Sequence, residues 1–239
     1  MNIFSFDVDW APEKVIQDVV DLLNEHNIKG TFFATHYSEV LKNIEKEGIH
    51  EIGIHPNFNP LLTGESGHYQ KKIDDLLEMY PSAVGLRSHS LVQSCPILIY
   101  SLEKKIKYDS NIYIPFGKNL QPFNYFGLLR IPYNWEDDGQ WVAGKSFSDC
   151  GLKLDAELNI FSFHPIHIYL NTHDQAMYDG VKQYYQIPDE LLKNRNKTIP
   201  GTRDLLLSLL KDCKNNNRPT STLKEYYTFL TKDPDFYKY

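Results

Sequence analysis

Residues 1–17 read MNIFSFDVDWAPEKVIQ, an apolar run that ends in two acids with one valine between them. Successive side chains of a strand point to opposite faces, so an extended chain would direct Asp7 and Asp9 to the same side. Two carboxylates this close resist ionising together unless a cation lies between them or one keeps a proton. The alternative is a solvated strand end, with Asp9 or the Ala11-Pro12 step beginning a helix. Taken alone, the stretch favours this plainer alternative.

The alternation of strand and helix that begins here continues along the chain. Hydrophobic periodicity predicts strands at 3–6, 31–34, 49–54, 83–86, near 108, 128–131 and 159–163, and helices at 12–27, 38–47, 69–80, 96–105, 202–213 and 221–230. Strands separated by helices are typical of βαβ units and a parallel sheet. Residues 111–150 are irregular and residues 171–198 form a polar excursion. We predict one domain over residues 1–239, a distorted (β/α) barrel of about seven parallel strands.

Composition excludes several classes of function. The 239 residues are 41% hydrophobic with a net charge of −6, and acids and bases are mixed. No basic stripe indicates nucleic-acid binding, and no apolar run approaches a membrane span. Cys95, Cys150 and Cys213 lack CxxC spacing, which argues against a disulfide framework or a thiolate zinc site. With no basic leader at the N-terminus, we expect a cytoplasmic protein.

Polar residues follow several of the predicted strands. Because the carboxyl ends of parallel strands converge on one face, these residues should meet. Carboxylates and imidazoles are ligands for a divalent ion, and a further acid and histidine can act as general base and general acid. The sequence therefore predicts a metal-assisted hydrolase site. The residues concerned are Asp7, Asp9, His55, Arg87, His89, His164 and His167.

The same segments resemble a known family. FSFDVDW (4–10), TFF (31–33), EIGIHPNFN (51–59), GLRSHS (85–90), PYNWEDD (132–138) and FSFHPIH (161–167) follow the order of the motifs of polysaccharide deacetylases. These are the carbohydrate esterase family 4 enzymes, or chitooligosaccharide deacetylase homology superfamily. Residues 220–230 also resemble the family's end, and the match is most similar to deacetylases of O-antigen or capsule synthesis. The resemblance implies a metal-dependent enzyme that removes an acetyl group from an N-acetylated sugar.

The resemblance also implies roles for single residues. Asp7 would be the general base, and Arg87 would pair with it and hold it charged. Asp9 and His55 would bind the metal ion, most simply zinc. His164 would protonate the leaving amine. Of the two acids in the opening stretch, Asp9 would then bind the metal ion and Asp7 would accept the proton.

Residues near these positions would complete the site. An acid of the WEDD segment, Asp137 or Asp138, would fix the tautomer of the late histidine, with Asp138 as our candidate. Trp135 or Tyr133 would wall the acetyl pocket. A backbone N–H near Ser90 would help to bind the oxyanion.

Two positions depart from the family's pattern. Its second histidine, four residues after the first, is replaced by Asn59, and a proline two places after the arginine is replaced by His89. An amide oxygen is a weak zinc ligand, so we predict that His89 completes a site with Asp9 and His55. Asn59 as the third ligand is the competing prediction, and a weakened or lost metal site is another.

Two other functions stay open at this point. One is a hydrolase of the same fold that acts on a small non-sugar amide, and the other is an inactive, metal-free carbohydrate-binding protein. For the deacetylase, the expected substrate is a cytoplasmic precursor such as a nucleotide sugar or a lipid-linked glycan. His167 is expected to be structural or substrate-facing, residues 109–111 a turn, and His26, His36, His50, His68 and His173 surface or loop residues.

Overall fold

A computed structural model describes residues 1–65, 67–155 and 158–233. The strands are β1 (Asn2–Asp7), β2 (Gly30–Ala34), β3 (Glu51–Ile54), β4 (Gly85–Leu86), β5 (Tyr108–Asp109), β6 (Phe123–Tyr125), β7 (Leu128–Arg130), β8 (Trp135–Glu136), β9 (Asn159–Phe163) and β10 (Thr220–Ser221). In the described residues they form one curled sheet in the order β6-β7-β5-β4-β3-β2-β1-β9-β8, with β10 beside the start of β1. All neighbours run parallel except β6 and β7.

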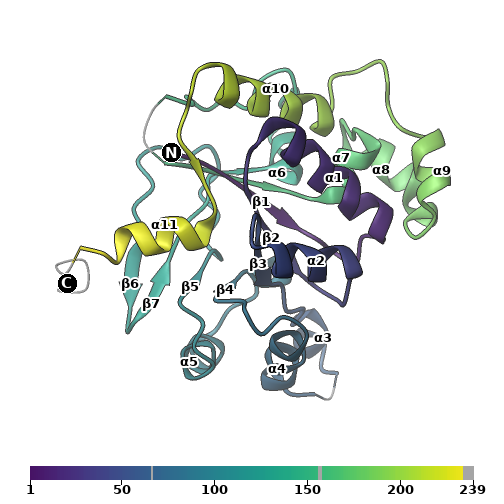
Figure 1. Cartoon of the computed structure of the whole chain (residues 1–239). Coiled ribbons are helices and arrows are strands. Elements are labelled where there is room, and N and C mark those ends of the chain that lie inside the picture. The colour runs from purple at the N-terminus through teal and green to yellow at the C-terminus, as the bar shows by residue number, and fades with distance from the viewer. Residues whose placement is uncertain (66, 156–157, 234–239) are drawn as a thin grey trace.

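Most of the helices cover the outside of the curled sheet (Figure 1). They are α1 (Glu13–His26), α2 (Glu39–Glu47), α3 (Asn59–Leu62), α4 (Tyr69–Met79), α5 (Cys95–Glu103), α6 (Asp137–Val142), α7 (Pro165–Leu170), α8 (Gln175–Val181), α9 (Pro188–Lys193), α10 (Thr202–Asn215) and α11 (Leu223–Leu230). Short 3₁₀ helices lie at His89–Leu91 and Lys182–Tyr184. None of the helices in the described ranges is long and apolar enough to cross a membrane.

The predicted distorted barrel is confirmed, and its parallel strands include those that the periodicity indicated. The structure adds β6, β8 and β10, which have two or three residues each and are too short to show a period. It also adds α3 and α6 to α9. The polar excursion at 171–198, for which no helix is predicted, contains α8 and α9.

One stretch of chain closes the barrel. Its beginning, β7, pairs with β5, and its end, β8, pairs with β9 at the other side of the sheet. Between them the N–H of Tyr133 donates to the carbonyl of Ile112 at 2.9 Å, and the N–H of Asn134 to that of Ile160 at 3.2 Å. Residues 128–136 therefore span the gap between the two sides and enclose an interior.

Alternation along β1 separates an outer core from an inner one. Phe4 and Phe6 lie in the outer core, between the sheet and helices such as α1, and Phe6 stacks on Phe32 with ring centroids 4.8 Å apart. Ile3 belongs to the inner core, inside the barrel. Ser5 alternates with these phenylalanines and contacts residues of the interior. The inner core also contains Phe33, Tyr108, Leu129, Ile131, Tyr133, Ile160 and Leu223.

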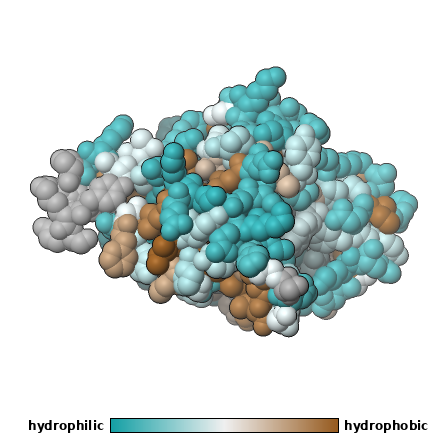
Figure 2. All heavy atoms as spheres, turned by 90° about the horizontal axis from the view of Figure 1, so that it is seen from below, coloured by the Kyte–Doolittle hydropathy of each residue, from teal (hydrophilic) through white to brown (hydrophobic). Residues whose placement is uncertain are grey.

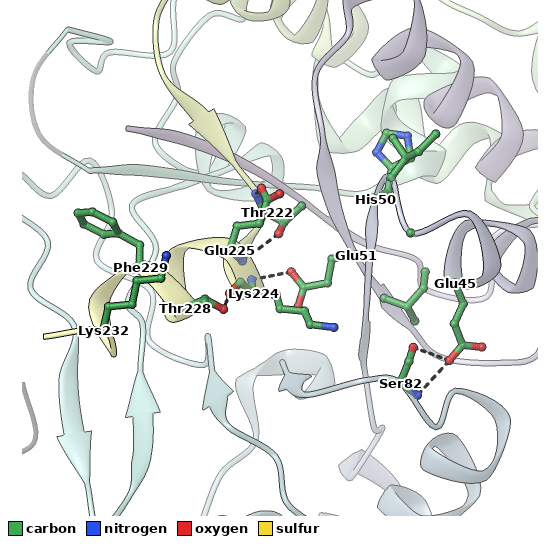
Figure 3. Close-up of a pocket in the computed structure, with 13 residues that line it drawn as sticks. Glu45, His50, Glu51, Ser82, Thr222, Lys224, Glu225, Thr228, Phe229 and Lys232 are labelled. Atoms are coloured by element: carbon green, nitrogen blue, oxygen red, sulfur yellow. Dashed lines mark hydrogen bonds between the residues drawn. The ribbon is translucent and has the colours of Figure 1, made fainter. Parts of the chain in front are cut away.

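The amino end of the barrel is closed by α11. Glu51 of β3 is buried there, and its carboxylate accepts hydrogen bonds from the hydroxyl of Thr31 and the backbone N–H of Lys224, both at 2.8 Å, and from the hydroxyl of Tyr108 at 2.5 Å. Figure 3 shows Glu51 and Lys224 in a hollow of about 500 Å³ between β3 and α11. The carboxylate also faces the positive end of the α11 dipole. Burial nevertheless raises the pKa of Glu51.

This raised pKa predicts how stability depends on pH. Folded Glu51 holds its proton more tightly than unfolded Glu51, so its ionisation reduces stability as the pH rises above its ordinary value of 4.5. In Glu51→Gln this loss is absent. Between about pH 5 and about pH 8, the free energy of unfolding of the wild type should therefore fall relative to that of the variant.

Urea unfolding of both proteins at the two pH values measures this difference, with the exposed Glu47→Gln as the control. Equal changes with pH in the wild type and in Glu51→Gln would show that the carboxyl does not titrate differently on folding.

His50, expected at the surface or in a loop, lies in the bend between α2 and β3 but is buried there. His50 is 5% exposed and precedes β3, where its Nδ1 accepts the backbone N–H of Gly30 at 3.1 Å. Its Nε2 lies 3.1 Å from the Asn24 side-chain oxygen. Burial lowers the pKa of His50 to about 4, so it is a neutral packing residue.

One face of the surface is seen in Figure 2, where hydrophilic side chains predominate and apolar ones gather in small separate groups. Among the described residues the most exposed large apolar side chains are Leu62, Phe126, Val142 and Phe229. Single exposed apolar residues of this kind are normal on a protein surface and indicate no binding face.

Candidate active site

Acids and histidines surround a cavity at the carboxyl ends of the strands. β1 ends at Asp7, His55 follows β3, Arg87 follows β4, and His164 follows β9. The cavity has a volume of about 260 Å³ and is lined by Asp7, Asp9, His55, Ser88, His89, Ser90, Leu91, Glu136, Asp138 and His164. The larger hollow of Figure 3 lies at the opposite, amino end of the barrel and contains none of these residues.

Asp9 lies among three imidazoles. Its Oδ1 is 3.2 Å from His55 Nε2 and 3.0 Å from His89 Nδ1, and its Oδ2 is 3.6 Å from His164 Nε2. Burial alone would raise the pKa of Asp9, but the hydrogen bonds to His55 and His89 outweigh it and hold that pKa well below its usual range. The same hydrogen bond raises the pKa of His89.

This cluster has the donor chemistry of a metal site. One oxygen of Asp9 and one nitrogen each of His55 and His89 lie within 4.8 Å of one another. His55 is buried, and its Nδ1 has no hydrogen-bond partner among the described residues. One carboxylate with two imidazoles, open to a cavity, is a set that binds zinc and similar divalent ions and leaves a position for water. The residues present therefore fit a divalent ion.

The two competing third ligands occupy different places. His89 contacts Asp9 directly, whereas Asn59 begins α3 and does not line the cavity. The Asn59 amide nitrogen donates instead to the Ser90 hydroxyl at 3.0 Å. The geometry therefore brings His89, and not Asn59, to Asp9 and His55.

Arg87 is fully buried inside the barrel and contacts Asp7. Its Nη1 lies 3.0 Å from Asp7 Oδ1, 2.9 Å from Ser5 Oγ and 2.8 Å from Ser162 Oγ. Its Nε and Nη2 donate to the carbonyl and hydroxyl of Ser110, each at 2.9 Å. The guanidinium is thus held on every side, and it places a fixed positive charge beside the Asp7 carboxylate.

Two aromatic rings complete the surroundings of this arginine. The guanidinium carbon lies 4.6 Å from the centre of the Phe33 ring and 4.5 Å from that of Tyr133. Tyr133, expected to wall the acetyl pocket, therefore packs in the inner core. Trp135, the alternative, is also fully buried and donates from its indole nitrogen to the Gln140 side chain at 2.9 Å. The structure places neither ring in the lining of the cavity.

Asp137, rather than our candidate Asp138, contacts His164. Its Oδ1 lies 2.7 Å from the imidazole Nδ1, and its Oδ2 accepts the backbone N–H of His164 at 2.7 Å. This arrangement directs Nε2 into the cavity. Burial alone would lower the pKa of His164, but the charges of Asp137 and Asp138 raise it well above its usual value. His164 thus presents Nε2 to the cavity, 3.6 Å from Asp9 Oδ2.

Asp138 has another partner. It lines the cavity and lies 3.2 Å from Nε2 of His167. His167 is buried between the rings of Trp141 and Tyr178, with centroids 4.8 Å and 4.7 Å away, and its Nδ1 contacts the Thr172 hydroxyl at 3.2 Å. His167 is thus a packed residue that holds Asp138 in place.

Glu136 also lines the cavity and was missed in the sequence. The Tyr133 hydroxyl donates to its carboxylate at 3.2 Å. Burial, together with neighbouring acids, raises the pKa of Glu136 to about 7. Strand alternation could have indicated Glu136, because a strand that directs Trp135 outward directs Glu136 inward. β8 has only two residues, however, which is too short for the alternation to be recognised in the sequence.

The backbone that carries Asp9 is strained. Asp9 and Trp10 have φ values of 45° and 58°, in the left-handed region that is uncommon for such residues. The Tyr185 hydroxyl donates to the Asp9 carbonyl, and the Gln186 side chain donates to the Trp10 carbonyl at 2.9 Å. The N–H of Trp10 donates to Thr35 Oγ1 at 2.9 Å. Residues of the excursion at 171–198 therefore hold the backbone at Asp9 and Trp10, a role that their sequence does not signal.

Residues 109–111 support the site from inside. Ser110 holds Arg87, and the Asn111 side-chain oxygen accepts the backbone N–H of Ser88 at 2.6 Å. Asp109 pairs with Arg130 at 2.7 Å. Asp109 is the last residue of β5 and the two residues after it form no turn, so the expectation of a turn is wrong.

A parallel barrel with a carboxylate–imidazole cluster, an acid paired with arginine and a histidine held by a second acid defines a hydrolase site at the strand ends. The family model described as WbmS-like polysaccharide deacetylase matches residues 4–182. The chain belongs to this family of polysaccharide deacetylases, and the predicted resemblance is confirmed.

Solved structures agree with this assignment. A protein from Bordetella bronchiseptica, described as a polysaccharide deacetylase involved in O-antigen biosynthesis, is 38% identical with a TM-score of 0.83, over 88% of this chain and 89% of that one. A Mycobacterium smegmatis protein described as a polysaccharide deacetylase, 16% identical over 98% and 90% of the chains with a TM-score of 0.60, shares the fold. So does the peptidoglycan deacetylase PdaC of Bacillus subtilis, 13% identical over 100% and 96% with a TM-score of 0.57. The comparison with curated proteins gave no match.

Proposed function

We propose that the protein is a metal-dependent hydrolase that removes the N-acetyl group from a sugar of a surface-polysaccharide precursor. The observation that carries the proposal is that Asp7, the Asp9 cluster and His164 all face one cavity of about 260 Å³. The 38% identity to a protein described as acting in O-antigen biosynthesis supports a sugar substrate over a small non-sugar amide. A cytoplasmic nucleotide sugar or lipid-linked glycan remains the predicted substrate.

Asp9, His55 and His89 would hold the ion, and their chemistry favours zinc. When bound, the ion would supply positive charge that polarises the amide carbonyl and makes water easier to ionise. The carboxylate of Asp7 takes a proton from the attacking water, and Arg87 keeps that carboxylate in place.

The remaining groups act on the amide as it breaks. A backbone N–H near Ser90 donates to the developing oxyanion. His164 delivers a proton from Nε2 to the amide nitrogen, and Asp137 stabilises the imidazolium before this transfer. The C–N bond then breaks, and acetate and a free amino sugar are the products. A protein that only binds sugars would need neither a base paired with arginine nor a charged histidine in the same cavity.

Metal content tests this proposal. Protein prepared without added metal or chelator should contain about one equivalent of zinc or another divalent ion. His55→Ala and His89→Ala should lose it, since removing a ligand weakens binding by more than the roughly 10–100-fold effect of its outer partners. Asn59→Ala and His68→Ala should retain it, because Asn59 does not line the cavity and His68 is exposed.

Acetate release from N-acetylated sugars, nucleotide sugars and lipid-linked glycans is measured on the same preparations. Loss of metal on Asn59→Ala but not on His89→Ala would reverse the choice of third ligand. An absence of metal from every preparation, even after zinc is supplied, would contradict the mechanism and favour the sugar-binding alternative.

A further inference from the structure

A second cavity adjoins the candidate active site. It has a volume of about 430 Å³ and is lined by Asp9, Trp10, His89, Tyr178, Lys182, Tyr185 and Gln186. Asp9 and His89 line the catalytic cavity as well, so the two cavities meet at the predicted metal ligands. A substrate with its acetyl group near Asp7 and His164 would therefore extend its remaining part past Asp9 and His89 into this second space.

One wall of the second cavity is an aromatic side chain on a backbone that hydrogen bonds hold in place. Trp10 is 38% exposed and has a left-handed backbone, held by the hydrogen bonds from Gln186 and to Thr35. Its ring meets His89 edge-on, with centroids 5.2 Å apart. An indole held in this way can contact the apolar face of a sugar ring at a small cost in conformational entropy.

The second cavity also carries a positive charge. Lys182 supplies this permanent charge among the residues lining the cavity. Its ammonium lies 5.6 Å from the centre of the Tyr178 ring. Nearby Lys14 and Lys193 are paired with Asp189 and Glu190, whereas no ion pair of the described residues involves Lys182. The lysine is exposed and its charge is available to a ligand.

We propose that the second cavity binds the part of the substrate beyond the N-acetylated position, and that it selects a negatively charged group there. Trp10 contacts the sugar ring, and Lys182 pairs with a carboxylate or a phosphate on that sugar or next to it. This inference rests on the proposed function, and it narrows the substrate class to anionic N-acetylated sugars.

Binding without turnover tests the inference. Asp7→Asn protein supplied with zinc is titrated with N-acetylglucosamine, N-acetylglucosaminuronic acid and N-acetylglucosamine 1-phosphate, and the indole N–H resonance of Trp10 is followed. We expect at least one anionic ligand to bind about tenfold or more tightly than the neutral sugar. Lys182→Gln should remove this preference, Lys182→Arg should keep it, and Lys197→Gln, an exposed lysine outside the cavity, should leave it unchanged.

The two anionic ligands distinguish the source of the charge. Tighter binding of the acid indicates a uronic acid, and tighter binding of the phosphate indicates a sugar phosphate or nucleotide sugar. Equal affinity for all three ligands, or a preference that survives Lys182→Gln, would overturn the inference. Because binding is measured apart from acetate release, a failure of the deacetylase proposal would appear in that assay and not in this one.

Discussion

Asp7→Asn is expected to lower kcat/KM for acetate release by about 10²–10⁴-fold, the usual contribution of a general base. An asparagine has the shape of the aspartate and can still accept the hydrogen bond from Arg87, but it cannot take a proton from water. The predicted metal ligands are Asp9, His55 and His89, so the metal content should stay near that of the wild type. Acetate release and metal content are measured on the same preparations.

The matched control is Glu136→Gln, which changes a second, partly buried carboxyl that lines the same cavity. Glu136 contacts Tyr133 and has no arginine beside it among the described residues, so this variant should lose less activity than Asp7→Asn. If Glu136→Gln were the inactive variant while Asp7→Asn kept most of its activity, the role of base would move to Glu136.

Arg87→Met is expected to reduce the free energy of unfolding by about 3–5 kcal/mol, because it leaves a buried carboxylate without its partner. The hydroxyls of Ser5, Ser110 and Ser162 would lose the hydrogen bonds that they accept from Arg87 in the same step. Urea unfolding measures the loss. In the double variant Asp7→Asn, Arg87→Met, part of the stability should return, since the unpaired charge is gone.

The control for this prediction is Lys71→Met, which breaks an exposed pair with Asp75 and should change stability by less than about 1 kcal/mol. Arg87→Lys serves if the methionine variant does not fold, because it keeps the charge but not the planar set of donors. A loss on Arg87→Met no greater than on Lys71→Met would show that the buried pair does not stabilise the fold.

Much of the barrel could be predicted because its longer strands are apolar runs that the sequence shows clearly. β1 and β9 are five or six residues long and buried throughout, and each is followed by the polar residues of the site. The strand ends therefore identified Asp7, His55, Arg87 and His164. Contacts between distant segments carry no such periodicity, which explains why the support of Asp9 by Tyr185 could not be anticipated.

The finer choices depended on turns rather than on strands. An extended chain was expected to direct Asp7 and Asp9 to the same side. Both line one cavity, but β1 ends at Asp7, and Asp9 reaches the cavity through a left-handed backbone rather than through strand alternation. Asp137 and Asp138 are adjacent, and only the first turn of α6 decides which of them faces His164. The position of His89 beside Asp9 similarly depends on the loop that follows β4.

Residues 128–136, which close the barrel, limit where the chain can gain or lose residues. Between Arg130 of β7 and Trp135 of β8, both ends are tied to opposite sides of the sheet. The N–H groups of Tyr133 and Asn134 bond to the two sides in turn, so one residue added or removed there would break these hydrogen bonds and displace Glu136 from the site. We therefore expect insertions to be tolerated less well in this short span than in exposed surface loops, where no such hydrogen bonds are lost. Divergence in length among such proteins should spare residues 131–134.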